Sequence, residues 1–201
     1  MTRLHQLSTR LIQAGELNAL LGEIIETAID LTRANKGNIQ LFQGGVLRIM
    51  EQRGFDSRFL DYFNQVEHGK AACGTALQRK ERVIIEDVAT SPIFAGTTAL
   101  DVMLAADARA VQTTPLVNRS GWILGMISTH YSMPQRPSER DLRLLDLLAR
   151  QAADLIERNQ NEQALRESEE RYRSLVLATS AFLWIADVNG EFSRRQPSWE
   201  S

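Results

Sequence analysis

Apolar side chains near the start of the chain recur at helical spacing. Leucines and isoleucines fall three or four residues apart through residues 4–31, and Gly15 stands between two sets of them. This periodicity predicts two helices separated at Gly15. Residues 35–37, Asn-Lys-Gly, then supply the stop signal for the second helix.

Two pairs of β-type runs each surround a turn. Residues 38–42 and 46–50 lie on either side of Gly44-Gly45, a combination that is typical of a tight hairpin. The longer runs at 109–117 and 122–131 surround an Asn-Arg-Ser-Gly tetrad, another turn-forming sequence. We therefore expect two antiparallel hairpins, with the longer one at the centre of a sheet.

Shorter patterns occupy the positions between and after the hairpins. Helical spacing predicts helices over 55–66, 74–79 and 100–108, and a run rich in Val and Ile predicts a strand over 82–87. From Ser138 no helix breaker occurs until past residue 174. The fold class predicted is α+β: an antiparallel sheet of about five to six strands, flanked by helices, with a long C-terminal helix.

The long C-terminal helix carries its own start signal and an apolar stripe. Ser138 is a plausible N-cap, and Asp141 follows three residues later in the manner of a capping box. The stripe alternates spacings of three and four and consists of Leu142, Leu145, Ala149, Ala152 and Ile156. We expect two copies of the chain to pair along it, giving a homodimer through the N- and C-terminal helices.

Composition excludes several classes of function. The 201 residues carry a formal net charge of -2 without a basic run interleaved with aromatics, so we expect no nucleic-acid partner. No apolar stretch reaches the roughly 18 residues that span a bilayer, so we expect no membrane segment. Cys73 is the single cysteine, which excludes an internal disulfide and any multi-cysteine metal site. We expect a cytoplasmic protein with no metal site and no required cofactor.

Four motifs resemble those of the GAF domain family over roughly residues 17–158. They are residues 86–87 (Glu-Asp), 91–94 (Ser-Pro-Ile-Phe), 114–117 (Thr-Pro-Leu-Val) and 121–130 (Gly-Trp-Ile-Leu-Gly-Met-Ile-Ser-Thr-His). The last is the most specific, because a turn glycine is followed by Gly125, a mid-strand glycine that lets another group approach the backbone closely. The divisions expected are an N-terminal helix (1–14), a GAF sensor domain (15–158), a helical linker (159–174) and a further fragment (175–201).

The C-terminal fragment resembles the beginning of a PAS domain. The resemblance rests on residues 170–175 and 184–190, and PAS domains of this sort follow GAF domains in bacterial sensor histidine kinases. It implies that the chain is part of a larger signalling kinase whose catalytic domain lies outside this sequence. Strands are expected at 182–186 and from 191 onward.

The GAF resemblance also implies a ligand site between the sheet and the insert at 87–107. Strand parity places Ile127, Thr129 and Tyr131 on one face, opposite His130. The lining residues expected are Asp87, Phe94, Gln112, Thr114, Thr129 and Tyr131. The alternative is that the pocket is filled by its own side chains. The sequence does not identify the small molecule.

Chemistry at Cys73 offers alternative functions. A thiol near a cleft can serve in redox sensing or attach a bilin, but bilin-binding relatives usually place a His after that Cys, where this chain has Gly74. GAF relatives that reduce methionine sulfoxide use several cysteines, whereas this chain has one, so this enzyme is the last of the alternatives. A nucleophilic pair with His130 is conceivable. We assign no catalytic residue and expect a sensory module that relays through its C-terminal helix.

Overall fold

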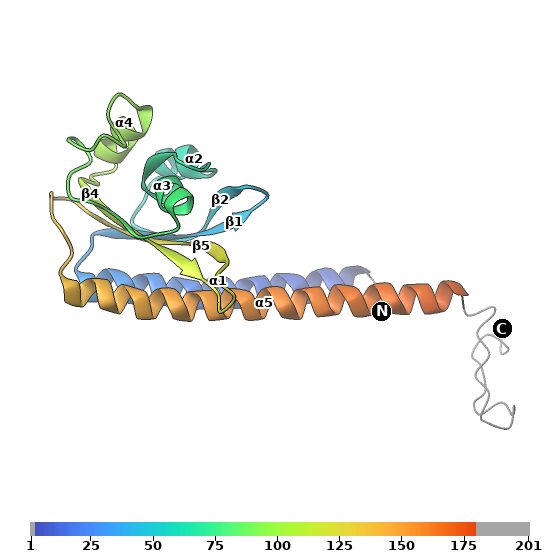
Figure 1. The fold of residues 1–201 in the computed structure, drawn as a ribbon. Coiled ribbons are helices and arrows are strands. Elements are labelled where there is room, and N and C mark those ends of the chain that lie inside the picture. The colour runs from blue at the N-terminus through green and yellow to red at the C-terminus, as the bar shows by residue number, and fades with distance from the viewer. Residues whose placement is uncertain (1–2, 180–201) are drawn as a thin grey trace, which may run out of the picture. The chain divides into compact units, whose positions relative to one another are not determined.

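The computed structural model describes residues 3–179, with side-chain detail for residues 16–176. It confirms the α+β class, with a five-stranded antiparallel sheet flanked by helices (Figure 1). In chain order the elements are α1 (Arg3–Thr32), β1 (Lys36–Gln43), β2 (Val46–Arg53), α2 (Ser57–Phe63), α3 (Ala71–Arg79), β3 (Val83–Ile85), α4 (Thr98–Ala105), β4 (Ala110–Val117), β5 (Ile123–Tyr131) and α5 (Glu139–Thr179).

The strand order is β2-β1-β5-β4-β3, with β5 at the centre. Both predicted hairpins are confirmed, because β1 pairs with β2 and β4 pairs with β5, each antiparallel. The first turns through Gly44 and Gly45 at φ values of 60° and 85°, a left-handed conformation that glycine adopts without steric cost. In the second, the Asn118 Oδ1 atom accepts hydrogen bonds from the backbone N–H groups of Ser120 at 3.1 Å and Trp122 at 2.8 Å.

Gly125 allows the two hairpins to join. It faces Leu41 of β1 in the ladder between β1 and β5. A Cβ atom at this position would collide with the backbone carbonyl of Gln40, so a side chain would push the two strands apart. The expected close approach at this glycine is therefore confirmed, and the approaching group is the neighbouring strand.

Helix α1 is a single element, so the predicted break at Gly15 is wrong. Glycine within a helix costs only about 1 kcal/mol relative to alanine, and packing elsewhere in the helix can offset that cost. The part of α1 that follows buries Leu17, Leu21 and Ile25 against the sheet. The helix ends at Thr32, and Arg33 then adopts a left-handed φ of 53°.

The sheet separates two layers of helices (Figure 1). Helix α1 and the beginning of α5 cover one side, which we call the helix face. Its buried side chains include Leu21, Ile25, Ile39, Leu116, Ile127, Leu145 and Ile156. Helices α2, α3 and α4 cover the other side, which we call the cavity face. Its buried side chains include Leu47, Phe59, Phe63, Phe94, Met103, Val111 and Met126.

Helix α5 begins with the predicted capping box. The Ser138 backbone N–H donates to Asp141 Oδ2 at 3.1 Å, and the Asp141 N–H donates to Ser138 Oγ at 3.2 Å. The helix then continues to Thr179 as one element, in agreement with the absence of a helix breaker.

The apolar stripe of α5 is not an intermolecular seam. Its five residues, Leu142, Leu145, Ala149, Ala152 and Ile156, are all buried in the helix-face cluster of a single chain. The prediction that two copies pair along this stripe is therefore wrong. The same spacing serves a helix that packs on its own sheet, which is why the pattern alone did not distinguish the two arrangements.

The chain divides into two units, one ending at Glu157 and one beginning at Arg158. In the second, Arg158 Nε donates to Glu162 Oε1 at 2.9 Å, and Ser174 Oγ donates to the Glu170 carbonyl at 2.9 Å. The first part of the PAS resemblance, residues 170–175, lies within α5. The strands expected at 182–186 and from 191 onward lie outside the described residues.

Candidate functional site

A small cavity lies on the cavity face, under helices α2 and α3. Its volume is about 20 Å³, enough for a single water molecule. We call it the inner cavity. The strands contribute Asn38, Gln40, Val111, Thr113, Ser128 and His130 to its wall, and the surrounding helices and loops contribute Phe59, Phe63, Ala71, Ala72, Cys73, Phe94 and Met103.

Three buried side chains of this wall have unpaired polar atoms. Asn38, Gln40 and His130 are 4%, 1% and 5% exposed. Within the described part of the chain, Asn38 Oδ1, Gln40 Oε1 and both ring nitrogens of His130 make no hydrogen bond. An unsatisfied buried polar group costs about 1–3 kcal/mol, so the concentration of such atoms around one cavity requires an explanation beyond the packing of the chain.

His130 is neutral in this environment. Its ring meets those of Phe55 and Phe59 edge-on, with centroids 4.9 Å and 5.8 Å away. Burial, and to a lesser extent the charge of Lys36, lowers the pKa of His130 to about 3. One ring nitrogen therefore carries a proton near neutral pH and the other is an acceptor.

The thiol of Cys73 is also neutral. Burial raises its pKa to about 11, although hydrogen bonds with the backbone of Gly74 and Cys73, and with the Gln40 side chain, oppose this shift. A Cys-His nucleophile requires the opposite arrangement, with a lowered cysteine pKa and a protonated histidine. The two residues line the same cavity, but their shifts do not favour such a pair. A redox or chromophore role for Cys73 stays a prediction.

A wider groove adjoins the inner cavity. It has a volume of about 430 Å³ and is lined by residues of α2, α3, α4 and the loops between them. Phe63 and Ala71 belong to the walls of both spaces. Lys70, a charged residue of this outer groove, is paired with Glu67 at 2.8 Å. Among the described residues, no cluster of His, Cys, Asp and Glu is suited to hold a metal ion.

Of the expected ligand-lining residues, the structure places Phe94 in the wall of the inner cavity. Asp87 lies elsewhere, in a two-point ion pair with Arg109, whose Nε and terminal nitrogen donate to it at 3.2 Å and 2.8 Å. This pair, with a hydrogen bond from the backbone N–H of Ala89, lowers the pKa of Asp87. Asp87 thus fixes the loop after β3.

The other four expected residues lie on the helix face. Gln112 and Thr129 are opposite each other in the ladder of β4 and β5, and Thr114 and Tyr131 share their parity. Parity grouped these residues correctly, but the opposite set, with Thr113, Ser128 and His130, faces the inner cavity. Because both faces of the sheet are buried, alternation could not show which set faces the insert. Ligand contact by the four stays a prediction.

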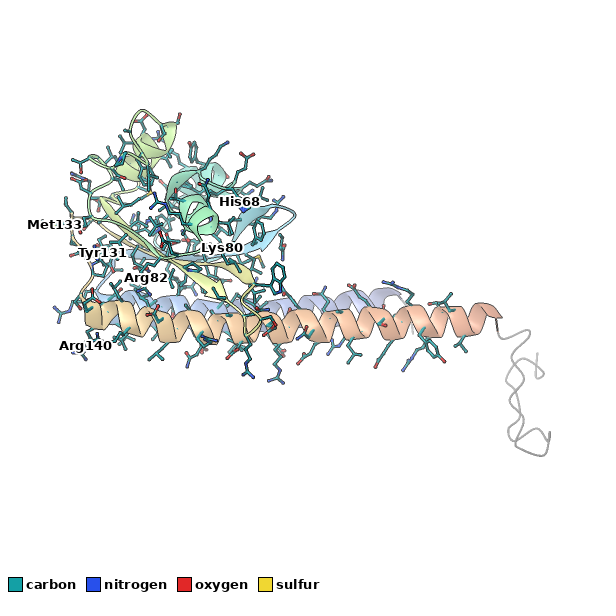
Figure 2. The ribbon with its side chains drawn as sticks, in the orientation of Figure 1. His68, Lys80, Arg82, Tyr131, Met133 and Arg140 are labelled. Atoms are coloured by element: carbon teal, nitrogen blue, oxygen red, sulfur yellow. The ribbon has the colours of Figure 1, made fainter. Side chains whose placement is uncertain are left out.

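On the helix face these residues connect the sheet to α5. Thr114 Oγ1 accepts a hydrogen bond from Arg82 Nε at 2.8 Å and donates to Gln112 Oε1 at 2.9 Å. Arg82 also donates to the Leu142 carbonyl at 3.1 Å and pairs with Asp146. Figure 2 shows Arg82 and Tyr131 on the side of the sheet where α5 lies. The Tyr131 hydroxyl and Thr129 Oγ1 are 3.1 Å apart.

Sequence reasoning missed Asn38 and Gln40. Both stand at alternate positions of β1, between which Ile39 and Leu41 point to the helix face. Polar residues at every second position of a strand ordinarily indicate a solvent-exposed face. Here they are buried, so the distinguishing signal was available only once helices α2 and α3 were seen to cover them.

A model of the GAF domain family matches residues 14–157 of this chain. The methyl sulfide methyltransferase-associated sensor of Methanosarcina acetivorans is 25% identical over 126 residues, which are 63% of this chain and 12% of that sensor. The chain thus spans about an eighth of that relative's length. None of the described helices has the length and apolarity needed to cross a membrane.

Solved structures with this fold come from several signalling proteins and from enzymes. A domain from Sinorhizobium meliloti, described as part of a two-component sensor histidine kinase, has a TM-score of 0.62 at 19% identity, covering 74% of this chain and 95% of that one. The GAF domain of a Coxiella burnetii phosphoenolpyruvate-protein phosphotransferase has a TM-score of 0.64 at 16% identity, covering 80% and 94%. A free methionine-R-sulfoxide reductase from Thermoplasma acidophilum has a TM-score of 0.59 at 14% identity, covering 72% and 94%. The family match and the shared fold together show that the chain belongs to the GAF domain family.

Proposed function

We propose that this GAF domain binds a small molecule in the inner cavity and transmits its occupancy to helix α5. The observation that carries the proposal is the set of unpaired polar atoms on Asn38, Gln40 and His130, buried around one space. A domain stabilised only by its own packing gains nothing from such groups. A ligand that pairs with them recovers the free energy that their burial costs.

The contacts on the other face of the sheet support the relay. His130 lies on β5, next to Val111 of β4 in the ladder. Strand β4 is connected to α5 through Thr114 and Arg82 to the Leu142 carbonyl, and the turn that follows β4 is connected to it through Asn118 Nδ2 to Glu157 Oε1 at 2.8 Å. A displacement of β4 and β5 on binding is thereby coupled to the part of α5 between Leu142 and Glu157.

The larger setting is proposed from resemblance. We place the domain in a cytoplasmic sensor protein, of the histidine kinase type, that continues into a PAS domain. The Sinorhizobium meliloti domain that is described as part of a two-component sensor histidine kinase has the same fold, which supports this setting. At less than 25% identity, that likeness demonstrates the fold alone.

Dimerisation remains part of the proposal, through a different surface from the stripe of α5. Leu20 and Leu31 on α1 and Leu147 on α5 are large apolar side chains that stay exposed, the last by 65%. Light scattering of the wild type and of Leu147→Glu tests this surface. We expect a dimer that the substitution dissociates, and a wild-type monomer at high protein concentration would rule it out.

Mass spectrometry of the purified chain tests the binding function. We expect a small molecule to be released on denaturation of the wild type, and to be absent from His130→Phe, which keeps the ring but removes both nitrogens. The matched control is His68→Phe, because His68 is an exposed histidine on the cavity side of the sheet (Figure 2). Equal release from wild type and His130→Phe, or none from the wild type expressed in its native cell, would contradict the proposal.

A further inference from the structure

The unpaired atoms of the inner cavity specify what a ligand must offer, provided that the proposed binding function is correct. Asn38 Oδ1 and Gln40 Oε1 only accept hydrogen bonds, whereas a neutral His130 ring donates one and accepts one. Thr113 Oγ1 and Ser128 Oγ are 2.9 Å apart, so one of their two hydroxyl hydrogens is used between them and the other can be donated. A ligand that pairs with these atoms must therefore carry at least two hydrogen-bond donors and one acceptor.

We infer that the inner cavity takes an uncharged, planar group that carries two or more N–H donors beside a carbonyl, as in a cyclic urea or a lactam-containing heterocycle. Adjacent donors would pair with the two amide oxygens. The carbonyl would accept from the histidine ring or the hydroxyl pair.

The absence of charge follows from the composition of the wall. Among the described residues that form it there is no Lys, Arg, Asp or Glu, and burial keeps both Cys73 and His130 neutral. A carboxylate, phosphate or ammonium group placed here would lose its hydration without gaining an opposite charge, which is far more costly than burying a neutral amide.

Planarity follows from the aromatic side chains around the cavity. Phe59 and Phe63 have ring centroids 4.6 Å apart, and Phe94 contributes a third aromatic side chain to the wall. Flat apolar surfaces pack well against a conjugated ring, while the strand side of the cavity supplies the hydrogen bonds. One face of the site is therefore apolar and the opposite face is polar.

The outer groove supplies the space that the inner cavity lacks. A volume of about 20 Å³ admits one water molecule, whereas a two-ring heterocycle needs several times more. Phe63 and Ala71 separate the inner cavity from the groove of about 430 Å³. Displacement of Phe63 and Ala71 would join the two spaces. The edge of the ligand that carries the N–H donors would then enter the inner cavity, and the remainder of the ligand would occupy the groove.

A single buried water is the rival occupant. It can donate to Asn38 and Gln40 and accept from His130, and it would satisfy the same atoms without any ligand. A water would not distinguish between added compounds, so competition among matched probes separates the two explanations.

The test uses the full chain and three probes followed by NMR titration. Benzimidazolone has two N–H donors and a carbonyl, its N,N′-dimethyl derivative keeps the plane and carbonyl without the donors, and benzimidazolone-5-carboxylate keeps both donors and the carbonyl and adds a charge. We expect benzimidazolone to bind at least about 10-fold more tightly than the dimethyl derivative, the effect of leaving a buried acceptor unpaired, and the carboxylate to bind most weakly. Asn38→Leu should abolish the preference, and His68→Phe should keep it.

The outcomes distinguish this inference from the function on which it rests. Equal affinity for the first two probes, or preference for the carboxylate, overturns the inferred ligand class while binding at the site stands. The same holds if no probe binds but the purified chain releases a small molecule. If no probe binds and nothing is released, water or side chains fill the cavity and both proposals fail.

Discussion

The two faces of the sheet use polar side chains in opposite ways, although the same strands form both. On the helix face, Thr114 bonds to Arg82 and Gln112, and Thr129 bonds to Tyr131. On the cavity face, Asn38, Gln40 and His130 leave four atoms without partners, whereas the other unpaired atoms among the described residues are Gln112 Nε2 on the helix face and Asn18 Oδ1 on α1. On one face the chain pairs most of its own polar atoms, and on the other it leaves unpaired the atoms that the proposed ligand would bind.

The largest expected effect is on the helix face. Leu145 is 0% exposed, so Leu145→Ala should create a cavity in the closely packed core and lower the free energy of unfolding by about 2–5 kcal/mol. Leu165→Ala, on the same helix but 61% exposed, is the matched control and should change it by less than about 0.5 kcal/mol. Urea unfolding followed by circular dichroism measures both. Similar losses would mean that α5 does not pack on its own sheet.

The next largest effect is the loss of stability at low pH that the buried His130 causes. The folded pKa of His130, about 3, lies below its ordinary value of 6.5, so between these values the unfolded chain binds more protons. Stability therefore falls as the pH drops from 6.5 toward 3, by up to about 1.4 kcal/mol per pH unit from this group. We expect the difference in unfolding free energy between wild type and His130→Phe to change by roughly 2 kcal/mol from pH 6.5 to 5. A constant difference would show that His130 titrates normally.

The smallest effect is a gain in stability. Asn38→Leu replaces a buried side chain that has an unpaired oxygen by an apolar one of similar size, so the ligand-free protein should become more stable by about 1 kcal/mol. Thermal unfolding of protein freed from any bound molecule measures the gain. A loss of stability would indicate that Asn38 is part of the permanent structure, and the contrast between the two faces would disappear.

Sequence reasoning succeeded where local residues determine the structure. The glycines at 44–45, the tetrad ending at Gly121 and the Ser138–Asp141 capping box each act within a few residues, and the elements that they predict are present. Phe94, expected to line a ligand site, lies in the wall of the inner cavity, and its contact with a ligand stays a prediction. Short-range chemistry was sufficient for these features.

The features that the sequence did not predict depend on which helix packs against which face of the sheet. The stripe containing Leu145 has a spacing that suits either a partner helix or a sheet, and nothing within α5 decides between them. Strand parity separated Thr129 from His130 but could not say which one faces helices α2 and α3. Asn38 and Gln40 resemble residues of a solvated strand until the helices above them are placed.

Ala71, which forms part of the boundary between the inner cavity and the outer groove, has a left-handed φ of 52°. Alanine is less stable in this conformation than in ordinary helical or extended backbone, by roughly 1–2 kcal/mol. A movement that lets Ala71 relax would return this energy and so offset part of the work of widening the entrance.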